Sequence, residues 1–278
     1  MKRIMIVAVV VIVILAIGVP YAFLVFQEGS QSQPPEQMTV FAAASLTKVM
    51  QNISEAFNMK YHANITFNFA SSNALATQIL QGFPCDVFLS ASTSYMQQVA
   101  NASMLNRSAV FARNSLIVMV SKSSASKVTS IADLAKAGVR VVLADKSVPA
   151  GSYALSVLNA IQSTWGNYSN PYYQGPQFAN FSKAVLANVI SYDTDVEQVV
   201  TKVVTGTADV GIVYKTDVIA QATNVDFITI PDQVNVIAQY PIGILSNSQH
   251  LKLAQEFYDF ILSDDGQKIL NNFGFLGR

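Results

Sequence analysis

Four segments of the sequence place small or hydroxyl-bearing residues where an expected strand ends and an expected helix begins. The first N–H groups of a helix have no partner inside the helix, and the helix dipole makes this end positive. A backbone cleared of bulky side chains lets an anion reach those groups, and a serine adds a hydroxyl donor. The segments are VFAAASLTKVM (residues 40–50), FASSNALATQILQG (69–82), SVPAGSYALSVL (147–158) and DTDVEQVVTKVVTG (193–206).

Each segment alone also fits an ordinary strand-to-helix turn, but four together favour a site for an anion. The residues that catalysis or metal binding would need have simpler interpretations. His62 and His250 are far apart in sequence, and Cys85 is the only cysteine. Asp193 and Asp195 precede a helical stripe, so we expect them to cap a helix rather than hold a metal. No nucleophile elbow, zinc motif or Walker loop is present, so the sequence predicts neither an enzyme nor a cofactor.

Composition narrows the class of partner. Of the 278 residues, 51% are apolar, only 12% are charged, and the formal net charge is zero. Nucleic-acid-binding domains carry clustered Lys and Arg, so we expect no nucleic acid partner. Short β-rich runs alternate with helical stripes, which is typical of α/β proteins with parallel sheets. The expected strands cover residues 38–44, 65–70, 86–91, 115–121, 140–145, 209–214 and 226–230.

The first 37 residues differ from the rest of the chain. Residues 4–26 form an uncharged apolar run of 23 residues after Lys2 and Arg3, which is long enough to span a bilayer. The positive flank predicts that the remainder faces outward. A transmembrane signal anchor followed by a polar linker is therefore expected over residues 1–37, and the protein would be held extracytoplasmically at the cell membrane. Removal of this segment as a signal peptide, which would give a secreted protein, is the alternative.

The motifs resemble those of a known family. VFAAASLTKVM, FASSNALATQI, PCDVFLSAS, VPAGSYA and DVGIVYKTD are similar, in order and spacing, to signature segments of the periplasmic molybdate-binding proteins of ABC transporters. The resemblance covers the chain from Met38 to its end. It implies a two-lobed periplasmic binding protein fold of type II, in which each lobe is a mainly parallel sheet flanked by helices. Lobe 1 would comprise residues 38–115 plus 244–278, and lobe 2 residues 116–243. Strands around residues 114–120 and 236–245 would form the hinge.

The resemblance also implies a function and a ligand shell. A monomer would capture molybdate or tungstate in the cleft between the lobes and deliver it to an ABC transporter permease. Another tetrahedral oxyanion such as sulfate is the alternative ligand. The sequence departs from the family pattern at Asn73, Cys85 and Ser152, none of which removes an expected donor. The implied donors are the side chains of Ser45, Ser72 and Tyr214 and the backbone N–H groups of Ala150 and Val196.

Overall fold

The computed structural model describes residues 36–278. The predicted transmembrane helix over residues 4–26 lies outside the described residues. Within residues 36–278, no helix has the length and apolar character needed to cross a membrane. The first strand begins at Glu36, so it includes the last two residues of the segment that was predicted to be a linker.

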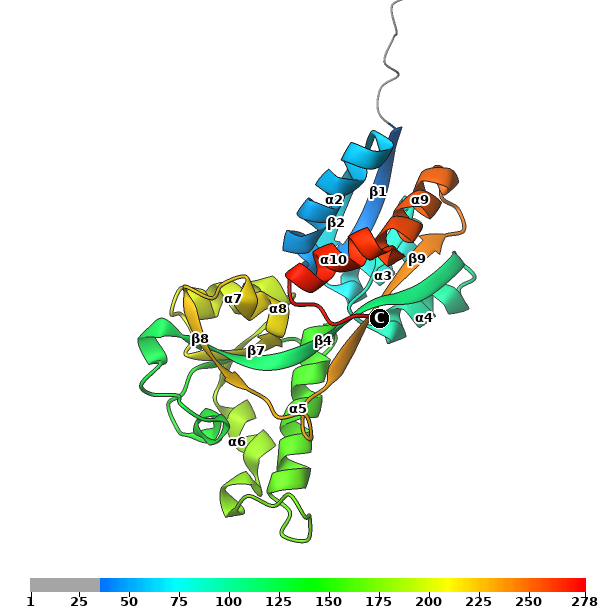
Figure 1. The fold of residues 1–278 in the computed structure, drawn as a ribbon. Helices are drawn as coiled ribbons and strands as arrows, with labels where there is room; N and C mark the ends of the chain where they lie inside the picture. The colour runs from blue at the N-terminus through cyan, green and yellow to red at the C-terminus, as the bar shows by residue number, and fades with distance from the viewer. Residues whose placement is uncertain (1–35) are drawn as a thin grey trace, which may run out of the picture. The chain divides into compact units, whose positions relative to one another are not determined.

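The first lobe is built on a sheet with the strand order β2-β1-β3-β9-β4 (Figure 1). Strand β1 is parallel to β2 and β3, whereas β9 is antiparallel to β3 and β4. The strands of this lobe are β1 (Glu36–Ala43), β2 (Ala63–Ala70), β3 (Val87–Leu89), β4 (Leu105–Ser121) and β9 (Ile237–Leu245). Its helices are the short 3-10 helix η1 (Ala44–Leu46), α2 (Thr47–Tyr61), α3 (Ser72–Leu80), α4 (Thr93–Asn101), α9 (Leu251–Leu262) and α10 (Asp264–Asn272).

The second lobe has a sheet with the order β4-β7-β5-β6, and β8 pairs with β4. Strand β5 is parallel to β6 and β7, whereas β4 is antiparallel to β7 and β8. The remaining strands are β5 (Val141–Ala144), β6 (Val189–Asp193), β7 (Val210–Tyr214) and β8 (Val225–Thr229). Helical segments are η2 (Lys122–Ser124), η3 (Ile131–Ala135), α5 (Pro149–Trp165), η4 (Pro176–Phe178), α6 (Phe181–Ala187), α7 (Val196–Val204) and α8 (Lys215–Ile219).

Strand β4 connects the two lobes. Up to Ser115 it pairs with β9 in the first sheet, and from Leu116 onward it pairs with β7 and β8 in the second. The predicted two-lobed α/β fold is confirmed. The prediction of mainly parallel sheets is wrong, because β4, β8 and β9 run antiparallel to their neighbours and make both sheets mixed. Strand β6 was missed by the sequence analysis.

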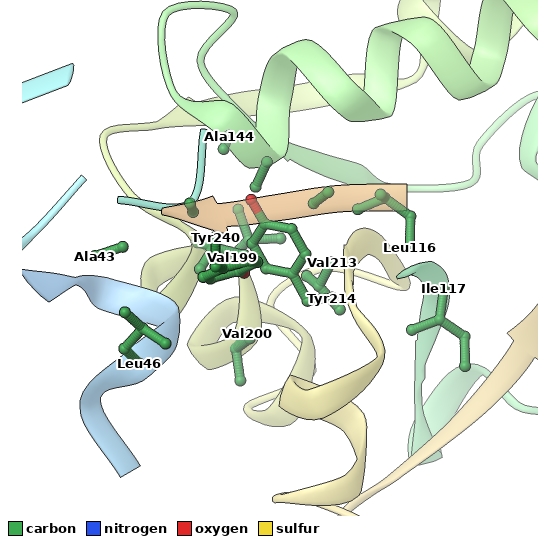
Figure 2. Close-up of a cluster of buried hydrophobic side chains, with 14 of the residues drawn as sticks. Ala43, Leu46, Leu116, Ile117, Ala144, Val199, Val200, Val213, Tyr214 and Tyr240 are labelled. Atoms are coloured by element: carbon green, nitrogen blue, oxygen red, sulfur yellow. The ribbon is translucent and has the colours of Figure 1, made fainter. Parts of the chain in front are cut away.

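A continuous apolar core joins the lobes beneath the strand ends. Figure 2 shows part of it, with Ala43 and Leu46 contributed by the first lobe and Val199 and Val200 by α7. Residue Leu46 is fully buried, which accounts for the apolar residue directly after the predicted Ser45 donor. The packed core holds η1 and α7 against each other, and the ends of both segments lie at the cavity described below.

A second, smaller core lies in the first lobe and contains Cys85. The thiol is buried, and burial raises its pKa to about 12. A thiol with that pKa is protonated at neutral pH and is a poor nucleophile. Cys85 therefore acts as a small apolar side chain in the packing of the first lobe.

Candidate functional site

The five residues that the sequence predicted as ligands line a single cavity. Its volume is about 10 Å³, far below the roughly 300–1,000 Å³ of sites for drug-sized organic ligands. A small ion therefore suits this cavity better than an organic molecule. The cavity is lined by Ala43, Ala44, Ser45, Ser71, Ser72, Ala91, Val148, Pro149, Ala150, Val196 and Tyr214.

The first lobe contributes two serine hydroxyls. Ser45 lies in η1, directly after the small residues that end β1, and Ser72 is the first residue of α3. The Oγ atom of Ser72 accepts a hydrogen bond of 2.9 Å from the backbone N–H of Ala91. Because an N–H group can only donate, the hydroxyl proton of Ser72 stays available for a ligand. The Oγ atom of Ser45 is hydrogen-bonded at 3.0 Å to the hydroxyl of Tyr240.

The second lobe contributes the start of α5. Pro149 is the first residue of this helix and has no N–H, so the N–H of Ala150 is the first that the helix offers. A Cβ on Gly151 would lie 2.1 Å from the carbonyl oxygen of Asp145 and 2.3 Å from that of Ala144. Only glycine therefore allows α5 to begin this close to the end of β5, which explains the glycine of the VPAG segment.

Helix α7 begins at Val196 and contributes a second helix N-terminus. Asp195 is its N-cap and accepts a 3.0 Å hydrogen bond from the N–H of Gln198, so the predicted capping role of Asp195 is confirmed. Asp193 does not cap the helix. Its carboxylate, at the end of β6, pairs with Lys202 and accepts from Ser191, so the capping prediction is wrong for this residue. A capped start leaves the N–H of Val196 among the free donors of the first turn.

Tyr214 is the last residue of β7 and is 1% exposed. Its hydroxyl has no hydrogen-bond partner among the described residues, although it is buried and the side chain lines the cavity. Its backbone N–H donates to the Asp217 carboxylate at 3.0 Å, which fixes the end of the strand. A buried, unpaired hydroxyl costs about 1 to 3 kcal/mol, and such groups are rare in native proteins unless something binds them. Tyr214 is therefore the strongest candidate among the cavity-lining residues for a group that contacts a ligand.

The electrostatics of the cavity come from dipoles rather than formal charges. Among the described residues, no Lys, Arg or His lines it. Burial raises the pKa of the Tyr214 hydroxyl well above its usual value, so this group stays a neutral donor. Burial also raises the pKa of Asp217 well above its usual range, and the nearby Glu197 carboxyl adds to that rise. The site can therefore donate hydrogen bonds to an anion, but it has no charged clamp.

Three hydrogen bonds cross between the lobes beside the cavity. The side-chain amide of Asn73 donates to Ser147 Oγ at 3.2 Å, and the hydroxyl of Tyr95 donates to the Ser147 carbonyl oxygen. The hydroxyl of Tyr153 donates to the carbonyl oxygen of Ala91 at 3.2 Å. These contacts hold the start of the second lobe's α5 region against the first lobe, so the structure has a closed cleft.

Two residues of the site were missed in the sequence analysis. Ala91 fixes Ser72, and its position at the end of the PCDVFLSAS segment made it detectable as another strand end next to a helix. Tyr240 contacts Ser45 from β9, and no local signal separates it from other core aromatics. Among the described residues, no group of three or more His, Cys, Asp or Glu side chains is arranged to hold a metal ion.

Comparison with known proteins identifies the family. Residues 38–276 match the model of the bacterial extracellular solute-binding proteins. The molybdate-binding protein ModA of Mycobacterium tuberculosis strain H37Rv is 33% identical over 246 residues, which cover 88% of this chain and 86% of ModA.

Two solved structures share the fold. The periplasmic molybdate-binding protein of Azotobacter vinelandii has a TM-score of 0.72 and 16% identity, with 87% of this chain and 99% of that chain covered. The sulfate-binding protein SubI of Mycobacterium tuberculosis has a TM-score of 0.74 and 17% identity, with 86% of each chain covered. With the match of the family model over nearly the whole described chain, these similarities show that the protein belongs to the bacterial extracellular solute-binding protein family.

Proposed function

We propose that the protein is an extracytoplasmic receptor that captures molybdate or tungstate between its lobes and delivers the anion to an ABC transporter permease. The observation that carries this proposal is the buried hydroxyl of Tyr214, which has no hydrogen-bond partner among the described residues and belongs to a small cavity whose polar side chains are all hydroxyls and whose lining includes no charged side chain. The similarity to ModA, a relative named for molybdate binding, supports the choice of ligand. Solute binding rather than catalysis is also what defines the family.

A tetrahedral dianion fits the chemistry of this cavity. Its four oxygens accept hydrogen bonds and have no proton to donate, while the cavity offers donors from both lobes. The hydroxyls of Ser45, Ser72 and Tyr214 and the N–H groups of Ala150 and Val196 would share the charge. Helix N-termini stabilise such an anion without a formal positive charge. The absence of an Arg clamp among the cavity-lining residues favours release of the anion to a permease.

Sulfate is the second candidate ligand. It has the same charge and shape, and the fold is shared with a protein named for sulfate binding. The cavity donors do not discriminate between the two anions by charge, so selection would depend on the size of the closed cavity.

The two lobes would close on the ligand by bending at β4 and β9. This proposal keeps the predicted division into residues 38–115 plus 244–278 and residues 116–243, except that all of β9 (Ile237–Leu245) is assigned to the first lobe, because it pairs there with β3 and β4. It is supported by the passage of β4 from one sheet into the other. Ser45 and Ser72 would belong to the first lobe and Ala150, Val196 and Tyr214 to the second. The ligand would then link the lobes, as expected for hinge closure.

We also propose that the N-terminal segment anchors the receptor in the cell membrane. The receptor would be a monomer and would bind tungstate as well as molybdate. The apolar run of residues 4–26 and its Lys2 and Arg3 flank support the anchor. Cell fractionation tests it. The mature protein should remain with the membrane and keep its N-terminus, and a soluble form beginning between residues 22 and 38 would contradict the anchor.

Isothermal titration of the purified full chain in detergent tests the ligand. We expect tight binding of molybdate and tungstate, weak binding of sulfate and weaker binding of phosphate. Hydrogen bonds to a charged group contribute about 1.5 to 3 kcal/mol each, so Ser45→Ala and Ser72→Ala should each weaken binding by about one to two decades. Binding of sulfate without binding of molybdate would replace the proposed ligand, and unchanged affinity in both variants would place the anion elsewhere.

A further inference from the structure

Tyr240 contacts the candidate site without lining it. This residue lies in β9 and is fully buried. Its hydroxyl oxygen lies 3.0 Å from the Oγ atom of Ser45, and the two residues are separated by 195 positions in sequence. Ser45 lines the cavity, whereas Tyr240 is absent from its lining. Any effect of Tyr240 on a ligand must therefore pass through Ser45.

The ring of Tyr240 is held in one place by other aromatic rings. Phe111, Tyr214 and Phe275 contact it edge to face, with ring centroids 6.3, 5.7 and 5.4 Å away. Figure 2 shows Tyr240 beside Tyr214 within the buried cluster. Packing on several sides fixes the ring, so the position of its hydroxyl is set before any ligand arrives.

The protonation states of the two hydroxyls decide the direction of their hydrogen bond. Burial raises the pKa of Tyr240 far above its usual value, so the phenol keeps its proton. If Ser45 donated to Tyr240, the phenol proton would need a different acceptor. Among the described residues, the 3.0 Å contact with Ser45 is the hydrogen bond that the Tyr240 hydroxyl makes, and the nearby side chains of Asn114 and Tyr214 lower the pKa of Tyr240, as groups that donate to it do. A buried donor without an acceptor is costly. The arrangement that satisfies both groups has Tyr240 donating to Ser45.

Ser72 provides a parallel within the same cavity. Its Oγ atom accepts from the backbone N–H of Ala91, a group that can only donate. Ser72 is therefore left to donate its own proton. Among residues 36–278, no backbone N–H donates to the Oγ atom of Ser45, which is instead hydrogen-bonded to the phenol of Tyr240. The Oγ atom of each serine thus accepts a hydrogen bond from another group of the protein, and each serine hydroxyl can donate its own proton to a ligand in the cavity.

We infer that Tyr240 is a positioning residue for anion binding: by donating to Ser45 Oγ, it makes Ser45 a donor to the bound oxyanion. This inference rests on the proposed function. It implies that the chain Tyr240 to Ser45 to anion acts as one unit. It also implies selectivity, because a serine that already accepts from Tyr240 is a poor acceptor for the hydroxyl of a protonated anion such as hydrogen phosphate.

The test uses the full chain and isothermal titration with sodium molybdate, sodium sulfate and sodium phosphate. Tyr240→Phe removes the hydroxyl but keeps the ring contacts, so we expect the fold to be retained. Molybdate affinity should fall about three- to tenfold, as expected for loss of one hydrogen bond between neutral groups. The ratio of molybdate to phosphate affinity should fall as well, because Ser45 is then free to accept. Thermal unfolding without ligand checks the fold of each variant.

A double-mutant cycle separates positioning from a structural effect. In the Ser45→Ala background, Tyr240→Phe should have almost no further effect on molybdate affinity. Tyr258→Phe is the control, since Tyr258 is an equally buried tyrosine of the first lobe whose ring packs on Arg107 away from the cavity. It should bind molybdate like the parent.

Each remaining outcome is decisive. Parental affinity in Tyr240→Phe would overturn the inference, and so would full additivity of the Tyr240 and Ser45 substitutions, because Tyr240 would then act by another route. In either case, tight binding by the parent and weak binding by Ser45→Ala would leave the proposed function intact. A parent protein that bound none of the three anions would instead overturn the proposed function, and this inference with it.

Discussion

Strand β7 runs from a fully paired carboxylate at one end to an unpaired hydroxyl at the other. Asp209, just before the strand, accepts hydrogen bonds of 2.6 to 2.8 Å from Ser124, Lys127 and Arg140. Tyr214, at the far end, is equally buried, but its hydroxyl has no partner among the described residues. The two residues are only five positions apart. The carboxylate of Asp209 has several hydrogen-bond donors, whereas the hydroxyl of Tyr214 has no partner among the described residues.

The difference suggests different roles for the two ends of β7: Asp209 stabilises the fold, and Tyr214 is available to bind a ligand. In α/β sheets, ligands bind beyond the carboxyl ends of the parallel strands, where helices begin. Tyr214 lies at such an end, next to the starts of α5 and α7. At the opposite end, the buried carboxylate of Asp209 is paired within the protein. Substitutions at the Asp209 end should therefore change folding, and substitutions at the Tyr214 end should change binding.

The largest effect is expected from Asp209→Ala. The substitution leaves the buried hydroxyl of Ser124 and the partly buried backbone N–H of Arg140 without an acceptor, so the free energy of unfolding should fall by about 3 kcal/mol. Urea unfolding measures this loss. Asp226→Ala is the matched control, because Asp226 also pairs with a lysine at 2.6 Å but is 44% exposed. An exposed pair should contribute only about 0.5 kcal/mol, and equal losses in both variants would contradict the comparison.

Tyr214→Phe should have the opposite profile. Removing one hydrogen bond to a bound dianion should weaken molybdate binding by about 2 kcal/mol, or roughly thirtyfold. The ligand-free protein should be as stable as the parent or slightly more stable, because the variant has lost a buried hydroxyl without a partner. Titration and urea unfolding together test this. A loss of stability with no loss of affinity would show that the hydroxyl has a structural role.

The junctions around Tyr214 were largely predictable from sequence because their signals are local. Small residues between a β-rich run and a helical stripe indicate a strand-to-helix turn wherever the segment lies in the fold. The segments around Ser45, Ser72, Ala150 and Val196 are all of this kind, and the structure brings them to one cavity. The resemblance to a family then supplied the order of the lobes, which no single segment contains.

The remaining features depend on partners that are distant in sequence. Asp209 and Ser124 are 85 positions apart, and Tyr240 and Ser45 are 195 apart, so no pattern near either residue reveals its partner. Strand direction is also not encoded in periodicity, which is why the antiparallel pairing of β4, β8 and β9 was not foreseen. Strand β6 alternates exposed and partly buried residues, and Ile190 and Tyr192 are half exposed, so it lacked the apolar run used to recognise strands.

Asp217→Asn is expected to have a smaller effect that depends on pH. Burial raises the pKa of Asp217 in the folded protein above its usual value of about 4. The stability linked to this group is therefore fully present below pH 4 and is lost as the pH rises toward the folded pKa. Asparagine keeps an acceptor for the Tyr214 N–H and does not titrate. The variant should thus become more stable than the parent as pH rises, which thermal unfolding from pH 4 to 9 measures.

At Asp209, the stability of the protein should depend on pH in the opposite direction. Hydrogen bonds and ion pairs hold the pKa of the Asp209 carboxyl below its usual range, against the effect of burial. Its contribution is present above pH 4 and is lost as the pH falls below that value. Asp209→Asn should therefore destabilise the protein at neutral pH and approach the parent only in acid. Parallel pH profiles for the Asp217 and Asp209 variants would contradict the proposed difference between the two ends of β7.

The smallest effect is expected from a hydrogen bond between the lobes, near the end of β7 that carries Tyr214. Asn73, which replaces the small residue common in the resembling family, donates to Ser147 across the lobes at 3.2 Å. The N–H and the hydroxyl of Ser147 both donate to the Asp145 carboxylate. These hydrogen bonds fix the Ser147 side chain and leave its oxygen free to accept from Asn73. Asn73→Ala should increase the dissociation rate of molybdate about threefold, because one hydrogen bond of the closed state is lost.

Stopped-flow release of molybdate measures this rate, and Asn68→Ala is the matched control. Asn68 also donates a side-chain amide hydrogen bond, to Gln78 at 2.7 Å, but both residues lie within the first lobe. Its removal should leave the dissociation rate unchanged. Urea unfolding of ligand-free Asn73→Ala should match the parent, since the side-chain amide oxygen (Oδ1) of Asn73 is buried without a partner among the described residues and its loss offsets the lost contact. Equal rates for the two alanine variants would show that the contact between Asn73 and Ser147 does not hold the cleft closed.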